Sequence, residues 1–284
     1  MKIKKIFITV TLTALLFIHT NGISPSPYKA FADDNAPVQV LNRDMETASG
    51  LTESKPEDFV IVDGALVKYT GNASIVNVPD GVEVIGREAF RIPRSWEPTY
   101  TGAPDYLMEI HLPKSVWMID SYAFQYCKNL TKITGTENVT EIGDSAFHDC
   151  GIQKMNLPKA VKIGEFAFQS SDIEEISLPK VESIGDYAFS GSKLKKLSGL
   201  GEVKKIGNSC FQSCPFVTDP KLRAKSPYCV VQKLSNGKEN VFFIANGILF
   251  ETGGYCRKNL VIPDGVREIN TCIRGSFTSV TIPD

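Results

Sequence analysis

Features that typify enzymes and nucleic-acid-binding proteins are scarce in this sequence. Its 284 residues include three His, and one of these, His19, lies in an apolar stretch near the N-terminus. No G-x-S-x-G elbow, Gly-rich phosphate loop or H-E-x-x-H motif occurs. Basic residues are not in excess, because 31 Lys and Arg balance 32 Asp and Glu. These absences predict a protein that is not an enzyme, uses no cofactor and has no general affinity for nucleic acid.

Groups that could hold a metal or act as a nucleophile are equally sparse. Cys210 and Cys214 form a Cys-x-x-x-Cys pair without a second pair at zinc spacing. Asp144, Glu165 and Asp186 occupy equivalent positions after a Gly. Such a carboxylate ladder is compatible with calcium but fits solvated turns more simply. We predict no catalytic residue and no metal site.

Long apolar runs are confined to the N-terminus. A basic segment at 1–5 precedes an apolar segment at 6–18, which is too short to span a bilayer comfortably. Ala-Phe-Ala at 30–32 fits the small-x-small cleavage rule. We predict a secretory signal peptide over 1–32, cleaved after Ala32, with an uncleaved anchor as the alternative. The mature chain would then be secreted or displayed at the cell surface, without a transmembrane segment.

A recurring phrase, I-G-x-x-A-F-x-x-C at 142–150, dominates the rest of the chain. Its Phe recurs at intervals of 34, 23, 21, 21 and 22 residues. The six repeat residues are Phe90, Phe124, Phe147, Phe168, Phe189 and Phe211. A period in the low twenties is typical of a leucine-rich-repeat solenoid, in which stacked coils share one core. We therefore expect these Phe side chains to lie in a single buried column.

Each repeat predicts one coil of that solenoid. A short strand with the pattern L-x-x-I-x-L is followed by Pro, which cannot continue a hydrogen-bonded ladder. The Gly of I-G would permit a turn that a side chain resists, and Ala and Phe would point inward. The predicted fold class is a mostly β solenoid with short parallel strands, turns or short helical turns opposite them, and β-hairpins near its ends.

Two hairpins are expected because apolar runs flank Asp63-Gly64 and Asn246-Gly247, which are strong turn signals. Each leads into another repeat-like phrase. We divide the chain into a signal peptide (1–32), a linker (33–56), a hairpin with the repeat array (57–214), an irregular connection (215–240) and a second hairpin with a terminal repeat-like unit (241–284).

The third and fifth positions of each strand phrase should face solvent on the sheet side. They form a mixed polar ladder that is either a solvated face or a ligand-binding surface. Its members are Glu109, His111, Lys132, Thr134, Lys154, Asn156, Glu175, Ser177, Lys196 and Ser198.

The first repeat interval carries an insertion at 91–106 that contains Arg94, Trp96, Tyr100 and Tyr106. Insertions in solenoids emerge as loops on one face, and aromatic residues are enriched at binding hot spots. The loop is therefore a second candidate ligand-binding site. The alternative is that Trp96 folds back over an open apolar edge.

Seven Cys is an odd number, so at least one thiol lacks an intramolecular partner. Cys127, Cys150 and Cys214 each follow a repeat Phe by three residues. They fit small buried core residues, although a disulfide between Cys127 and Cys150 remains open on geometry.

The full phrase, L-x-x-I-x-L-P-x-x-V-x-x-I-G-x-x-A-F-x-x-C, resembles the BspA-like leucine-rich repeat of bacterial surface proteins. The resemblance covers about residues 59–284 and is clearest over 107–214. It implies a secreted or cell-surface protein that adheres to, or recognises, an extracellular host or matrix protein or a glycan. The alternative is an architectural, self-assembling envelope module without a host ligand. The oligomeric state does not follow from the sequence.

Overall fold

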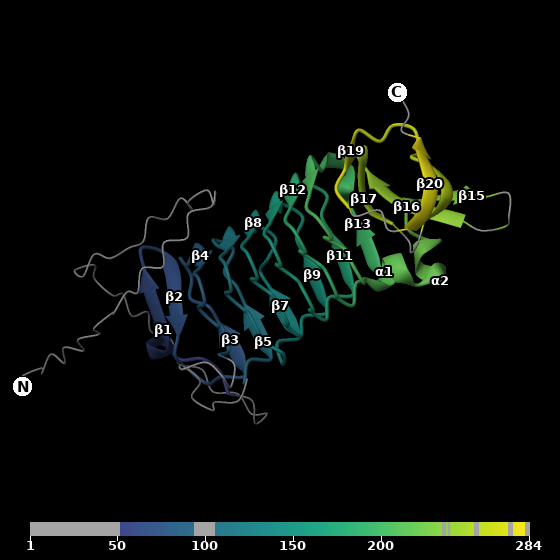
Figure 1. The fold of residues 1–284 in the computed structure, drawn as a ribbon. Helices are drawn as coiled ribbons and strands as arrows, with labels where there is room; N and C mark the ends of the chain where they lie inside the picture. Colours follow the sequence, from purple (N-terminus) through teal and green to yellow (C-terminus); the bar gives the residue numbers. More distant parts are fainter. Residues whose placement is uncertain are drawn as a thin grey trace, which may run out of the picture. The chain divides into compact units, whose positions relative to one another are not determined.

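The fold is taken from a computed structural model, which describes residues 52–93, 106–234, 237, 239–252, 256–271 and 275–281. Side chains are described for these residues except 256–259 and 275–281. The chain winds through successive coils, each of which places one short strand on either side of a shared core (Figure 1). The predicted solenoid is therefore confirmed. Within the described residues, no helix is long and apolar enough to cross a bilayer.

One side of the stack is an eight-stranded sheet in the order β1-β2-β4-β6-β8-β10-β12-β14, in which β1 is Phe59–Val62 and β2 is Ala65–Tyr69. Its coil strands are two residues long, are parallel, and each ends on the Ile of the repeat phrase. They are β4 (Val84–Ile85), β6 (Met118–Ile119), β8 (Glu141–Ile142), β10 (Lys162–Ile163), β12 (Ser183–Ile184) and β14 (Lys205–Ile206). Because these Ile side chains are buried, each coil covers the apolar side chains of the preceding coil.

The opposite side carries three-residue parallel strands whose central side chain points inward. They are β3 (Ile75–Asn77), β5 (Glu109–His111), β7 (Lys132–Thr134), β9 (Lys154–Asn156), β11 (Glu175–Ser177) and β13 (Lys196–Ser198). These strands do not form one continuous sheet. The ladder comprises β3-β5-β7 and β9-β11-β13, with no pairing between β7 and β9.

The repeat Phe residues form the predicted column through the middle of the stack. Consecutive rings lie 5.1–5.3 Å apart between centroids and 4–13° from parallel. Phe90 is 6% exposed and the other five are fully buried. Tyr69 stacks on Phe90 at one end, and Phe216 and Phe250 meet Phe211 edge-on at the other. The column is thus covered at both ends by aromatic rings from outside the repeats.

The turns between strands show why Gly follows Ile, and the reason differs from the predicted one. Gly143 does not have a positive φ. A Cβ there would lie 2.4 Å from the backbone nitrogen of Ser121 in the neighbouring coil, so close coil packing requires Gly. The left-handed backbone occurs two residues later, at non-Gly positions such as Ser145, Phe166 and Tyr187. The Asp144 carboxylate bridges coils by accepting the N–H of Glu165 at 2.8 Å.

The cysteines three residues after Phe belong to a buried column that also contains Ser171 and Ser192. Cys127 and Cys214 each donate their thiol to a Phe carbonyl of the preceding coil at 3.0 Å. Cys127 and Cys150 are not joined by a disulfide, so that alternative is wrong.

Both predicted hairpins are present. β1 (Phe59–Val62) pairs antiparallel with β2 (Ala65–Tyr69), and β16 (Glu239–Ala245) pairs antiparallel with β17 (Ile248–Thr252). Positive φ angles at both residues of each turn, 48° and 77° at Asp63-Gly64 and 46° and 75° at Asn246-Gly247, match the type I′ turn. The second strand of each hairpin then pairs in parallel with a coil strand, β4 in one case and β19 (Glu268–Ile269) in the other.

The stretch at 215–240 is not irregular as predicted. Pro215 and Pro220 each open a short helix, α1 (Pro215–Thr218) and α2 (Pro220–Arg223), because Pro is favoured at the first helical position. β15 (Cys229–Lys233) follows and pairs with β16. The C-terminal unit also contains a separate parallel pair, β18 (Cys256–Val261) and β20 (Gly275–Thr281).

The described end of the predicted linker is ordered against the first coil. Glu53 forms a bridge with Ile75, and Pro56–Asp58 is a 3-10 helix, η1. Residues 33–51 of the predicted linker and the predicted signal peptide lie outside the described residues.

Candidate functional site: a polar sheet face with an interrupted ladder

The ten predicted surface residues lie in two rows on the solvent side of the three-residue strands. Strand register aligns Glu109 with Lys132, and Lys154 with Glu175 and Lys196, in the first row. The second row aligns His111 with Thr134, and Asn156 with Ser177 and Ser198. Both rows are polar because only the central residue of each three-residue strand packs into the core.

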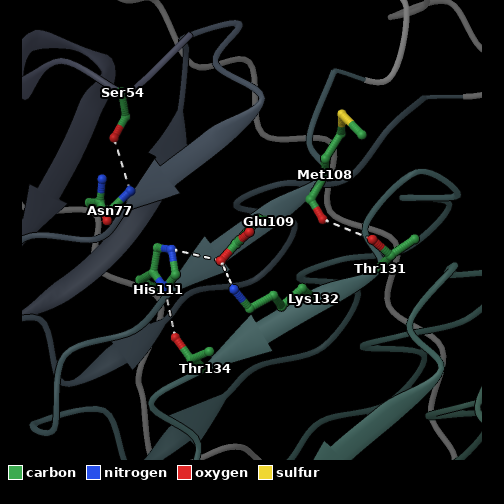
Figure 2. Close-up of polar contacts among 8 residues, drawn as sticks. All are labelled: Ser54, Asn77, Met108, Glu109, His111, Thr131, Lys132 and Thr134. Carbon is green, nitrogen blue, oxygen red and sulfur yellow. Dashed lines mark hydrogen bonds and ion pairs between the residues drawn. The ribbon is translucent and has the colours of Figure 1, made fainter. Parts of the chain in front are cut away.

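The N-terminal half of this face is a connected network (Figure 2). The His111 ring contacts Glu109 through Nε2 at 3.0 Å and the Thr134 hydroxyl through Nδ1 at 2.7 Å. The Lys132 ammonium donates to the same Glu109 oxygen, Oε1. Every one of these contacts joins β5 to β7 or lies within β5. The network therefore fixes the side chains of two neighbouring strands.

A hydroxyl–imidazole–carboxylate series such as Thr134–His111–Glu109 has the order of groups found in many hydrolases. Here the carboxylate is shared with Lys132, whose ammonium contacts the same Glu109 oxygen as the His111 ring. The series lies on an open strand surface, where His111 is 36% exposed. It forms part of the exposed polar face.

The interruption between β7 and β9 has a local cause in Gly135 and Thr136. In neighbouring coils, the residue after the strand donates its N–H to the next coil, as Leu112 does to the Thr134 carbonyl at 3.0 Å. Gly135 occupies that position with φ +79°, and a Cβ would come within 1.9 Å of the Leu112 carbonyl oxygen. The Thr136 hydroxyl instead donates to the Asn156 carbonyl at 2.6 Å. A side chain thus replaces one bond of the backbone ladder.

A Gly with positive φ also marks the end of the second group of strands. Gly199 follows β13 with φ +87°, and a Cβ there would lie 2.7 Å from the Leu178 carbonyl carbon. The next residue is buried in both places, as Thr136 after β7 and Leu200 after β13. A left-handed Gly after the strand is therefore the local signal that the parallel ladder stops.

An open hollow of about 390 Å³ lies over this interruption. Five of its lining residues are Ser, Thr or Asn, which have short polar side chains. It is lined by Ile133, Thr134, Thr136, Glu137, Lys154, Met155, Asn156, Glu175, Ile176, Ser177, Lys196 and Ser198. Seven of the ten residues predicted for this face, from Thr134 to Ser198, thus line one hollow. The other three, Glu109, His111 and Lys132, are not part of its lining.

The hollow offers hydrogen-bonding groups of both kinds. Hydroxyls of Thr134, Ser177 and Ser198 can donate or accept, and the Asn156 amide does both. Lys154 and Lys196 flank Glu175 in register, and all three side chains are exposed. The lining holds no aromatic ring. The arrangement suits a polar ligand with several hydroxyl, amide or carboxylate groups.

The second predicted site falls mostly outside the described residues. Arg94, Trp96 and Tyr100 lie there, and Tyr106 is described and is 45% exposed. The sequence pattern did not indicate Asn77, which extends the second polar row because it aligns with His111. It also missed Thr136 and Glu137. The absence of Leu-Pro at 135–136, where other coils have it, could have marked that position.

Stacked parallel coils around one shared core define a leucine-rich-repeat solenoid. Residues 101–218 match in six copies the family model described as BspA type Leucine rich repeat region. Residues 101–218 therefore carry repeats of that type, as the sequence predicted.

Several solved bacterial leucine-rich repeat proteins are similar to the chain. One from Bacteroides ovatus is 24% identical over 80% of this chain and 61% of its own, with a TM-score of 0.44. The T. pallidum Leucine Rich Repeat protein is 22% identical over 61% of this chain and 94% of its own, with a TM-score of 0.44. The chain spans less than two thirds of the Bacteroides ovatus protein. No curated protein matches the sequence.

Proposed function

We propose that this chain is a non-catalytic binding protein, secreted or displayed at the cell surface, that recognises an extracellular protein or glycan on its polar sheet face. The observation that carries the proposal is the hollow at the β7–β9 interruption, where groups from four coils converge. A surface that merely needed solvation would not require the ladder to be broken. The family is typically secreted or surface-exposed, which agrees with the predicted signal peptide.

The chemistry of the hollow favours a ligand that is held by many polar contacts. Lys154, Lys196 and Glu175 provide both signs of charge, and short hydroxyl side chains leave room for an approaching chain. The Glu109–His111–Lys132 network can extend the contact toward the N-terminal coils. A repeat surface of this kind gains affinity from the sum of contacts over neighbouring coils.

An array of purified extracellular-matrix proteins and glycans, probed with the mature chain, tests the proposal. Binding of each ligand found on the array is then compared between wild type, Lys154→Trp and Lys162→Trp. Lys154 lines the hollow, whereas Lys162 is an exposed Lys of the same coil on the opposite sheet. We expect Lys154→Trp alone to lose binding. The proposal is contradicted if the wild type binds nothing on the array, or if the two variants bind a ligand equally well.

The insertion at 91–106 remains a second proposed contact region. Deleting residues 94–105 should weaken binding of a ligand that spans both surfaces and leave the hollow intact. Undiminished binding by a folded deletion variant removes the loop from the proposal. Self-assembly is a separate candidate function, favoured by a strand edge in the C-terminal unit.

A further inference from the structure

β15 is the outermost strand of the sheet β15-β16-β17-β19 (Figure 1). Within the described part of the chain it pairs with β16 alone. Two of its side chains, Val230 and Val231, are 40% and 44% exposed. A strand edge of this kind presents unpaired backbone groups, and proteins usually cover or charge such edges. An edge strand with two exposed Val side chains therefore points to a partner strand.

The register of the β15–β16 pair shows which backbone groups face outward. Ile244 donates its N–H to the directly opposite Tyr228 carbonyl at 2.8 Å, so this is a hydrogen-bonded pair. Such pairs alternate along an antiparallel ladder. Cys229, Val231 and Lys233 therefore direct their N–H and C=O groups away from β16. The hydrogen bond of Cys229 is consistent with this assignment, because its N–H donates to the Ser226 carbonyl at 3.3 Å and not to β16.

We propose that this edge is an interface between two copies of the chain, which pair antiparallel about a two-fold axis at Val231. The Val231 N–H of each copy donates to the Val231 carbonyl of the other. The Lys233 N–H of each copy donates to the Cys229 carbonyl of the other. The resulting four hydrogen bonds join the two C-terminal sheets into one continuous sheet.

A second copy fits this edge because the strand is complementary to itself in that register. The two exposed Val231 side chains become neighbours on one face and cover each other. The two Lys233 side chains lie two residues from the axis in opposite directions, roughly 14 Å apart along the strands. That separation exceeds the Debye length of about 8 Å, so their repulsion is screened.

The interface is small, which sets its expected strength. Five paired residues on each side bury less than the roughly 1,200 Å² of a standard stable interface. We therefore expect a weak dimer, with a dissociation constant of roughly 0.1–1 mM. Display of many copies on one surface would favour such an interaction by raising the local concentration.

Sedimentation velocity over about 10 µM to about 1 mM tests the proposal. The wild type should shift toward the dimer, and Val231→Pro should weaken association at least tenfold. Pro removes an N–H that β16 does not use, so the thermal midpoint should change little. Val231→Glu is a second disruptive variant, because it places two carboxylates together at the axis. Val230→Thr is the matched control on the other face of the strand and should still dimerise.

The proposal is overturned if Val231→Pro and Val231→Glu associate as strongly as the wild type. A wild type that stays monomeric throughout the range also overturns it. The interface and the proposed ligand site share no residue, so either can fail alone. Ligand binding by Val231→Pro at wild-type strength would separate the two.

Discussion

The Thr136 hydroxyl donates to the Asn156 carbonyl at 2.6 Å, in the place where neighbouring coils make a backbone bond. Thr136 is 3% exposed, so its hydroxyl has little access to water. This one contact bridges the coils on either side of the interrupted ladder. It also forms part of the hollow proposed to bind ligand.

Thr136→Val therefore tests whether the side chain stabilises the interruption. The substitution keeps the shape and removes the donor to the Asn156 carbonyl. We expect the free energy of unfolding to fall by about 1 kcal/mol. Chemical denaturation measures it, with Thr131→Val as the control, because Thr131 makes a longer contact of 3.4 Å at an exposed position. Equal effects of the two substitutions would show that the 2.6 Å bond has no special role.

The aromatic column gives a second prediction. Phe147 is fully buried between Phe124 and Phe168, and replacing it by Ala should destabilise the fold by about 3–5 kcal/mol. Tyr187→Ala is the control, since its ring also stacks on a neighbour, Phe166, but is 36% exposed. Its expected cost is about 1 kcal/mol. Denaturation midpoints that fall equally in both variants would contradict the column's role as the core.

Asp144 gives a prediction about contacts between coils. Its carboxylate accepts the Glu165 N–H at 2.8 Å, which satisfies a backbone donor of the next coil. Asp144→Ala should cost about 1 kcal/mol of unfolding free energy. Asp144→Asn retains an accepting oxygen and should cost less. If the Asn variant is as unstable as the Ala variant in the same denaturation assay, the carboxylate acts by some means other than this bond.

Alkaline stability should depend on Cys214. Burial raises the pKa of its thiol from 9.0 to about 12. Above pH 9 the unfolded chain loses this proton while the folded chain keeps it, so stability falls as pH rises from about 9 to about 12. Cys214→Ser removes the titrating group, and Ser171 shows that a hydroxyl fits this column, donating to Phe168 at 2.7 Å.

The expected result is a smaller loss of denaturation midpoint between pH 8.5 and pH 11 in Cys214→Ser than in wild type. The loss should be reduced but not abolished, because burial also raises the pKa of Cys210 and of Tyr69. Identical pH profiles for the variant and the wild type would show that Cys214 does not titrate in the manner its burial implies.

The sequence predicted the parts of this fold that recur. Equal spacing was sufficient to place Phe147 and Phe168 in one column, because stacked coils bring equivalent residues together. The turn residues Asp63-Gly64 predicted a hairpin because few residue pairs adopt two positive φ angles. Alternation along each strand placed Lys154 and Asn156 on the exposed side.

What the sequence did not predict depends on departures from the repeat. Gly135 resembles an ordinary turn residue, and only its approach to the Leu112 carbonyl shows why the ladder stops there. β15 was missed because its Val pair lies within a polar stretch and becomes a strand through pairing with β16. The predicted role of Gly143 in the turn was wrong, because close contact with the neighbouring coil, and not its own φ angle, requires a Gly there.

Binding of ligand in the hollow at the interrupted ladder can be tested by calorimetric titration of an array-selected ligand into wild type, Lys154→Trp and Lys162→Trp, with all three shown to be folded. We expect at least tenfold weaker binding by Lys154→Trp and unchanged binding by Lys162→Trp. Unchanged affinity in Lys154→Trp, or an equal loss in both variants, would contradict it.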